Sequence, residues 1–178
     1  MLPRAVARHP LLQACLGLGL LGLHLAAQSQ PQALAEPQLK AQVLFKVLRF
    51  IEWPPRSLAE GQAVQLCLLE DGTPLAQELQ ALDGRKMDNH VLLVRSVRDR
   101  QLGGCHIALI GDAPGLPVAP AATLLVSESP GMLERGAMLN LQVEDGRVVF
   151  DVGLEAARRA GLDISAKLLR LARFVKKS

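Results

Sequence analysis

The sequence predicts a single-domain α/β fold in which a mixed β-sheet, including one antiparallel hairpin, is flanked by helices. Three observations predict this class. After the first 35 residues, short apolar segments alternate with segments of helical periodicity. Two alternating apolar runs flank Asp145 and Gly146, a pair typical of a two-residue hairpin turn. The remaining length suits one domain and is too short for two.

Residues 1–35 are predicted to be a signal peptide. A short basic stretch precedes an apolar run over residues 11–27, and no acidic residue occurs before Glu36. Small residues would allow cleavage after Ser29 or after Ala35, and we favour the second site because a folded domain would then begin at residue 36. The domain is therefore expected to span residues 36–178.

Two alternatives are open for this segment, an uncleaved membrane anchor and a lipoprotein acylated at Cys15. The apolar run of about seventeen residues is short for a membrane-spanning helix. It also continues well past Cys15, where the cysteine of a lipoprotein signal would end it. Both observations favour a cleaved signal peptide and an exported protein.

Residues 37–52 are expected to form the first helix of the domain. Leu39, Val43 and Val47 repeat every four residues, as on the apolar face of an amphipathic helix. Pro54 marks its end, because proline cannot continue a helix and restricts the residue before it.

Strands and a short helix follow in the order typical of an α/β domain. Thr73 is placed to cap a helix over residues 74–82. Residues 113–121, rich in proline, glycine and alanine, admit one helical turn or none. The strands expected before the hairpin are residues 63–69, 91–97, 106–110 and 123–127.

The last part of the chain is expected to contain the hairpin and two helices. The hairpin strands are residues 138–143 and 147–152. A helix over residues 154–160 is expected to end at Gly161, and Ser165 is expected to cap a final helix that runs to about residue 175.

The charge pattern argues against a nucleic-acid partner. Without residues 1–35 the chain has 18 basic and 17 acidic residues, so its formal charge is +1. Tyrosine is absent, and no broad basic stripe is interleaved with aromatic residues. Basic residues do gather near the C-terminus: Arg158, Arg159, Lys167, Arg170, Arg173, Lys176 and Lys177.

The residues available for catalysis or metal binding are few, so we expect a protein that is not an enzyme and holds no metal or cofactor. After the signal peptide only His90 and His106 remain, and no zinc-protease, serine-hydrolase or phosphate-loop motif occurs. Cys105 and His106 are adjacent, which fits no common zinc frame. Neighbours on a strand also point to opposite faces, so this pair is not expected to form a reactive thiol site.

Cys67 and Cys105 are the two cysteines left after the signal peptide. An even pair in an exported protein predicts one disulfide. Two buried free thiols and a redox enzyme that uses both cysteines are the alternatives.

Several segments together resemble the YfiR family of periplasmic proteins over essentially the whole predicted mature chain. The segments that carry the resemblance are Phe50-Ile51-Glu52-Trp53-Pro54, the strand with Cys67, Gly103-Gly104-Cys105-His106-Ile107, residues 124–127 with Gly131 and Met132, Gly136-Ala137-Met138-Leu139-Asn140, and the long run over residues 156–172. Their order and spacing make the match specific, whereas each alone is weak.

The resemblance implies a regulator that represses a membrane-bound diguanylate cyclase by contacting its periplasmic region, thereby lowering cyclic-di-GMP and biofilm formation. It also implies relief by an outer-membrane lipoprotein, a homodimer, and a stabilising bridge between Cys67 and Cys105. The candidate partner contacts are Phe50, Trp53, Pro54, Arg158, Arg159, Leu168, Leu169 and Leu171. Trp53 has an alternative interpretation as an anchor in or beside the core.

The chain also departs from the family pattern. It lacks the second cysteine pair of some members, so a switch with two disulfides is not expected. Arg135 and Gly153 stand where the family has glycine and asparagine. A second functional hypothesis is a periplasmic small-ligand-binding module that reports to another membrane sensor, such as a histidine kinase, with Trp53 and neighbouring arginines forming the pocket.

Overall fold

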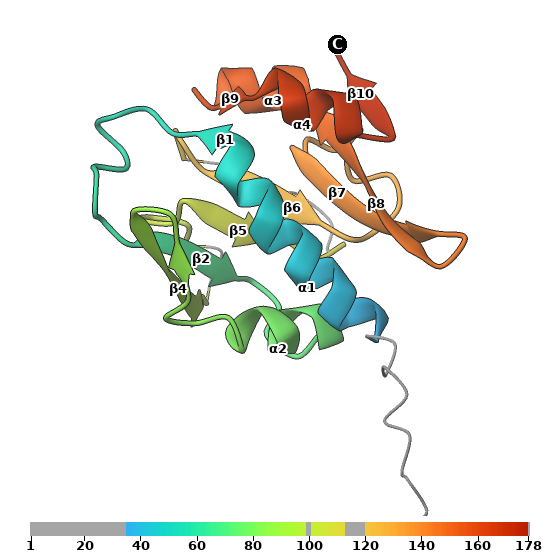
Figure 1. Cartoon of the computed structure of the whole chain (residues 1–178), viewed down its shortest axis with the longest axis horizontal. Helices are drawn as coiled ribbons and strands as arrows, with labels where there is room; N and C mark the ends of the chain where they lie inside the picture. The colour runs from blue at the N-terminus through green and yellow to red at the C-terminus, as the bar shows by residue number, and fades with distance from the viewer. Residues whose placement is uncertain (1–34, 99–100, 113–119, 178) are drawn as a thin grey trace, which may run out of the picture. The chain divides into compact units, whose positions relative to one another are not determined.

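The computed structural model describes residues 35–98, 101–112 and 120–177 (Figure 1). These residues belong to one compact unit, residues 33–178. The predicted signal peptide lies outside the described residues except for Ala35, and so does most of the segment 113–121.

A mixed eight-stranded sheet forms the centre of this unit, with strand order β10-β8-β7-β6-β5-β2-β4-β3. Its strands are β2 (Val64–Leu68), β3 (Lys86–Met87), β4 (His90–Ser96), β5 (Ile107–Leu109), β6 (Leu124–Ser127), β7 (Leu139–Glu144), β8 (Arg147–Gly153) and β10 (Phe174–Lys176). The neighbours from β4 to β7 run parallel, whereas the β7–β8 and β3–β4 pairs are antiparallel. The predicted α/β class with a mixed sheet and an antiparallel hairpin is confirmed.

Four α-helices and one 3₁₀ turn alternate with the strands in the described part of the sequence (Figure 1). They are α1 (Glu36–Val47), the 3₁₀ turn η1 (Leu48–Phe50), α2 (Pro74–Gln80), α3 (Leu154–Arg159) and α4 (Ala166–Leu171). A separate two-stranded sheet joins β1 (Ile51–Glu52) to β9 (Asp163–Ile164).

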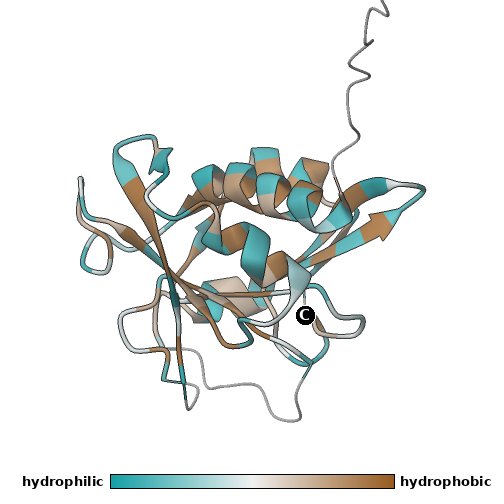
Figure 2. Cartoon of the chain, turned by 90° about the horizontal axis from the view of Figure 1, so that it is seen from below, coloured by the Kyte–Doolittle hydropathy of each residue, from teal (hydrophilic) through white to brown (hydrophobic). Residues whose placement is uncertain are grey.

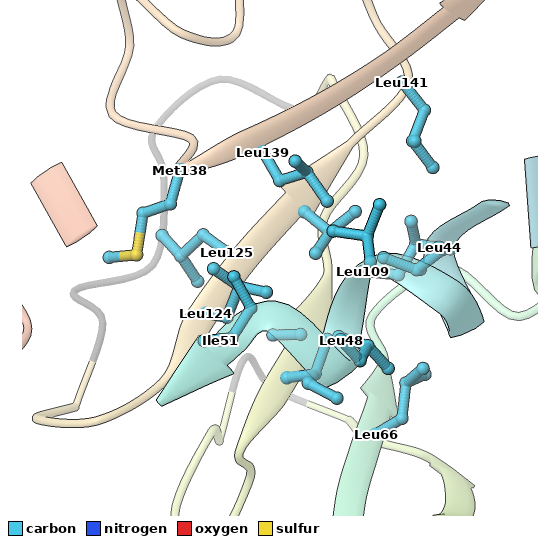
Figure 3. Close-up of a cluster of buried hydrophobic side chains, with 14 of the residues drawn as sticks. Leu44, Leu48, Ile51, Leu66, Leu109, Leu124, Leu125, Met138, Leu139 and Leu141 are labelled. Atoms are coloured by element: carbon cyan, nitrogen blue, oxygen red, sulfur yellow. The ribbon is translucent and has the colours of Figure 1, made fainter. Parts of the chain in front are cut away.

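The main core lies between α1 and one face of the eight-stranded sheet. Leu44 and Leu48 lie close to the apolar side chains of the central strands (Figure 3). Leu44, Leu48 and Leu66 are almost completely buried, as is Leu124. The parallel strands β2, β5 and β6 are almost entirely buried, as expected for central parallel strands. Figure 2 shows hydrophobic segments on the strands and both hydrophobic and hydrophilic segments on the helices.

Local signals in the sequence are confirmed at the turns and caps. Asp145 and Gly146 have φ of 48° and 72°, the conformation that the two-residue hairpin turn needs. Gly161 closes α3 with φ of 81°. The side chains of Thr73 and Ser165 accept hydrogen bonds from the first turns of α2 and α4.

The ends of two predicted helices are wrong. The first α-helix ends at Val47, and the chain then becomes extended at Ile51, where β1 pairs with β9. The last helix ends at Leu171, after which Arg173 donates its backbone N–H to Phe150 and β10 joins β8 in parallel register. In both places hydrogen bonds to a distant strand override the local helical periodicity, which carries no information about that strand. The short strand β3 was also not predicted.

Candidate partner-binding surface

Two segments that are far apart in the sequence meet beside the core. Ile51 pairs with Ile164 and Glu52 with Asp163, and the backbone N–H of Ser165 donates to Phe50 O at 3.0 Å. The structure thereby brings residues 50–54 next to residues 158–171. We call these two segments together the β1–α4 surface.

Side-chain contacts hold the two parts of the β1–α4 surface together. The ammonium group of Lys167 lies 5.3 Å from the ring centroid of Phe50, a cation–π contact. Pro54 lies against Gly161, where an added Cβ would be 3.7 Å from Pro54 Cγ. The predicted contacts from the two ends of the chain therefore belong to one continuous region.

The candidate contact residues differ in exposure. Arg158 and Arg159 are exposed, and Leu171 is exposed to 63%. Phe50, Trp53, Pro54 and Leu169 are half-buried, and of these Phe50, Trp53 and Leu169 pack against the core. The exposed groups of this surface are therefore the guanidinium groups of Arg158 and Arg159 and the aliphatic side chain of Leu171.

The expectation that Leu168 contacts a partner is corrected by its burial. Leu168 is exposed to only 1% and belongs to the hydrophobic core. Its backbone N–H is capped by Ser165 Oγ at 3.3 Å, which fixes the first turn of α4. In the six-residue helix α4, Leu168 is the buried residue that anchors the helix in the core, and Leu171 at its C-terminal end is exposed.

Trp53 is an anchor beside the core, as one of its two interpretations expects. Its indole N–H donates to His106 O at 3.3 Å, and its ring packs against the core. It also lines a pocket of about 390 Å³ between η1 and the β3–β4 turn. The other residues around this pocket are Leu48, Arg49, Ile51, Glu52, Leu58, Met87, Asp88, Asn89 and His90.

An ion pair forms one wall of this pocket. Arg49 Nε donates to Asp88 Oδ2 at 2.9 Å, and Arg49 Nη2 bonds the other carboxylate oxygen. The hydrogen bond from Arg49 holds the pKa of Asp88 below its ordinary value, so the pair stays charged. The pocket can thus offer an indole face and a polarised carboxylate–guanidinium pair to a small molecule.

The predicted disulfide between Cys67 and Cys105 is confirmed. Cys67 lies in β2, and Cys105 precedes the neighbouring strand β5, with 5.9 Å between their Cα atoms. Both residues are buried, at 0% and 5% exposure. Arg95 Nη2 lies 3.4 Å from Cys105 Sγ and donates to Gly103 O at 3.0 Å, so it covers the bridge from outside.

His106 has a structural role that the sequence did not reveal. Its Nδ1 accepts the backbone N–H of Gln65 at 2.9 Å, so the proton of the neutral ring is on Nε2, which donates to Ser57 O at 2.9 Å. His106 therefore ties the chain after Pro54 to β2. No group of three or more His, Cys, Asp or Glu residues able to hold a metal occurs among the described residues.

Arg173 is a second residue whose structural role sequence reasoning missed. Its Nε donates to Asp151 Oδ1 at 2.8 Å and its Nη1 to Glu144 Oε1 at 2.7 Å. Hydrogen bonds to these two carboxylates raise the pKa of Arg173. These hydrogen bonds hold the chain between α4 and β10 against the β7–β8 hairpin. The sequence could not predict them, because Arg173 was expected only as a residue of the last helix.

The mixed sheet, its helices and the buried disulfide define a small α/β protein. The chain belongs to the YfiR/HmsC-like family, whose model matches residues 37–173. Membership indicates a periplasmic regulator in cyclic-di-GMP signalling, and the family is not known to be catalytic. A search of curated proteins found no match. Over residues 35–98, 101–112 and 120–177, no helix has the length and apolar character needed to cross a membrane.

Solved structures resemble the chain only at the level of its general arrangement. One is a conserved domain protein from Vibrio cholerae O1 biovar El Tor, at 10% identity and a TM-score of 0.47, with 80% of this chain and 61% of that chain covered. Another is an ABC domain in complex with L-Trp from Streptococcus pneumoniae, at 10% identity and a TM-score of 0.49, with 76% and 60% covered. The chain spans about three fifths of both, and we base no functional inference on either.

Proposed function

We propose that this protein acts in the periplasm as the repressing subunit of a membrane-bound diguanylate cyclase. Binding to the periplasmic region of the cyclase lowers cyclic-di-GMP and with it biofilm formation. The protein does this by occupying its partner and carries out no reaction, so it needs no metal or cofactor.

The observation that supports this proposal most is the β1–α4 surface. Two segments of the family resemblance, residues 50–54 and residues 156–172, are joined by the β1–β9 pair. The surface presents Arg158 and Arg159 to solvent, and Phe50 on the same surface is half-buried. Arginine together with an aliphatic or aromatic anchor is the usual composition of an interface hot spot. The neighbouring half-buried Phe50 and Pro54 would form the rest of the contact.

Two further partners belong to the proposal. An outer-membrane lipoprotein would relieve repression by sequestering the protein, and two copies of the chain would form a homodimer. Nucleic acid is not a partner, because the excess of basic residues is confined to the C-terminal end.

Charge reversal at the two arginines tests the proposed contact. Arg158 is bonded only to Glu155, at a long 3.4 Å, and both arginines are exposed, so the double variant R158E/R159E is expected to fold. It should leave the cyclase active, with cyclic-di-GMP near the level of a deletion strain. The matched control is K86E/R147E, two exposed residues elsewhere, which should repress normally. Full repression by R158E/R159E would show that the contact lies elsewhere.

The pocket beside Trp53 favours a second candidate function, a small-ligand-binding module that reports to another sensor such as a histidine kinase. Trp53 is the only tryptophan of the chain, so its fluorescence reports directly on this pocket. A ligand from the small-molecule fraction of a periplasmic extract should change the emission of the wild type and not of Arg49→Ala. Unchanged emission, together with capture of a membrane partner, would favour the repressor.

A further inference from the structure

Opposite charges are strongly separated along the domain. Residues 36–157 contain eleven basic and sixteen acidic residues, whereas residues 158–177 contain seven basic residues and one acidic residue. The formal charge of +1 therefore hides a cationic C-terminal segment on an otherwise acidic domain. Such a segment attracts an anionic surface over about a Debye length, roughly 8–10 Å.

The same segment carries the two most exposed of the large hydrophobic side chains among the described residues. Leu171 is exposed to 63% and Phe174 to 53%, whereas the other two, Leu93 and Val143, are each exposed to 37%. Leu171 ends α4, and Phe174 begins β10. The chain advances three residues from Leu171 to Phe174, so their Cα atoms lie at most about 11 Å apart.

Both apolar residues are held on a firm support. Leu168 anchors α4 in the core, and Arg173, between Leu171 and Phe174, is bonded to Asp151 and Glu144. Phe174 itself is paired in register with Asp151 of β8. Exposure of the two side chains is therefore built into the fold and is not the fraying of a loose end.

Basic residues flank the two apolar residues in the sequence. Arg170, Lys176 and Lys177 have no salt bridge within the part of the chain that the structure describes. Lys167 lies on the ring of Phe50 at the edge of the same segment. Long basic side chains around protruding apolar groups are the usual composition of a peripheral membrane contact, because the apolar groups enter the acyl boundary while the cations reach lipid phosphates.

A lipid surface fits this segment better than a protein partner does. Three pockets, of about 390, 280 and 230 Å³, are lined by residues from other segments, whereas the side chains of Leu171 and Phe174 are exposed. A protruding side chain needs a matched cavity in a protein partner, whereas a bilayer accepts it without one. Anionic headgroups also complement the uncompensated lysines at about 1 kcal/mol for each cation near the surface.

We propose that residues 167–177 form a peripheral docking surface for an anionic phospholipid bilayer, with Leu171 and Phe174 entering the interface and Arg170, Lys176 and Lys177 contacting phosphates. This surface continues the β1–α4 surface and would hold the domain beside a membrane-bound partner. The proposal does not depend on which protein that partner is.

Vesicle sedimentation tests the proposal with the protein as recovered from the periplasm. The wild type should sediment with vesicles of phosphatidylcholine and phosphatidylglycerol in equal amounts, and far less with phosphatidylcholine alone. Binding should weaken as salt is raised. The variant L171S/F174S should lose at least about tenfold in affinity, because two partly buried apolar side chains contribute well over 1.4 kcal/mol. The variant K176Q/K177Q should lose roughly tenfold or more.

Matched controls separate this proposal from its competitors. The variant L93S/V143S removes the other two exposed apolar side chains and should bind as the wild type does, and all variants should melt near the wild type. Equal sedimentation with both kinds of vesicle, or unchanged binding by L171S/F174S, would overturn the proposal. If L171S/F174S changes only the mass of the protein in solution, the patch is an interface between copies. No cyclase is present in this assay, so its failure leaves the repressor proposal to the R158E/R159E test.

Discussion

At the scale of single residues, Gly153 is required by a close approach of two backbones. Its N–H donates to Met138 O at 2.9 Å, and a Cβ at this position would lie 2.7 Å from Ala137 O, inside any real contact distance. Because the obstacle is a backbone carbonyl just before β7, it cannot move aside as a flexible side chain would. The absence of a side chain at Gly153 therefore lets the end of β8 pack closely against the chain that leads into β7.

We expect Gly153→Ala to destabilise the domain by about 1–3 kcal/mol, the usual cost of overpacking a well-ordered site. Urea unfolding followed by circular dichroism measures this change. The control is Gly72→Ala, because an added Cβ there meets nothing within 4 Å. If both variants unfold at the same urea concentration as the wild type, the close approach at Gly153 does not constrain the fold.

Lys40 is the buried cation whose titration should be visible in stability. It is exposed to only 7%, and its Nζ lies 2.7 Å from Glu36 and 3.0 Å from Glu128. Burial by itself lowers the pKa of Lys40, but the hydrogen bonds and charges of Glu36 and Glu128 outweigh it and leave the pKa above its ordinary value of 10.5. The folded state therefore binds this proton more tightly than the unfolded state does.

The sign of the linkage gives an alkaline prediction. The contribution of Lys40 is fully present below the ordinary pKa of 10.5 and is lost as the pH rises through the folded-state value. When the pH is raised from neutral to above the folded-state pKa of Lys40, the free energy of unfolding should fall more for the wild type than for Lys40→Met. Lys46→Met, at an exposed position of the same helix, should lose as much as the wild type. If the free energy of unfolding depends on pH in the same way for the wild type and Lys40→Met, the prediction is contradicted.

At the scale of elements, the Cys67–Cys105 bridge fastens two neighbouring central strands. It closes a sequence separation of 38 residues, and the chain-entropy model assigns about 4 kcal/mol to a loop of this length. We expect Cys105→Ser to lower the melting temperature of the oxidised protein and its level in the periplasm. The wild type under strong reductant should approach the variant. Equal melting of the oxidised wild type and Cys105→Ser would remove the stabilising role of the bridge.

Elements that depend on local signals could be predicted from the sequence. The hairpin at Asp145 and Gly146, the caps at Thr73 and Ser165, and the end of α3 at Gly161 all use residues whose conformational preference acts within one turn. Elements completed by a distant partner could not be predicted. The β1–β9 pair and the parallel strand β10 exist because another segment offers free backbone groups, and helical periodicity does not report this.

The candidate site shows the same division. Its two segments were identified through family resemblance, but their meeting depends on the β1–β9 pair. Helical periodicity placed Leu168 and Leu169 on one apolar face, and only packing distinguishes buried Leu168 from half-buried Leu169 and exposed Leu171. His106 and Arg173 were missed because their roles consist of hydrogen bonds to backbone or carboxylates far away in the sequence.

At the scale of the whole chain, three features fit a regulator that acts beside a membrane. The family is that of YfiR/HmsC-like proteins, the partner candidates lie together on the β1–α4 surface, and the cationic end of the chain continues that surface. We propose that export depends on residues 1–35, whose basic start and apolar run predict a cleaved signal peptide.

The cellular level of cyclic-di-GMP in a deletion strain tests the repressor proposal most directly. The level should rise when the gene is deleted and fall again when the exported wild-type protein is expressed from a plasmid. The same protein expressed without residues 1–35 should fail to restore the low level, because it would not reach the periplasmic region of the cyclase. An unchanged cyclic-di-GMP level on deletion would contradict repression of a diguanylate cyclase and would favour ligand binding at the Trp53 pocket instead.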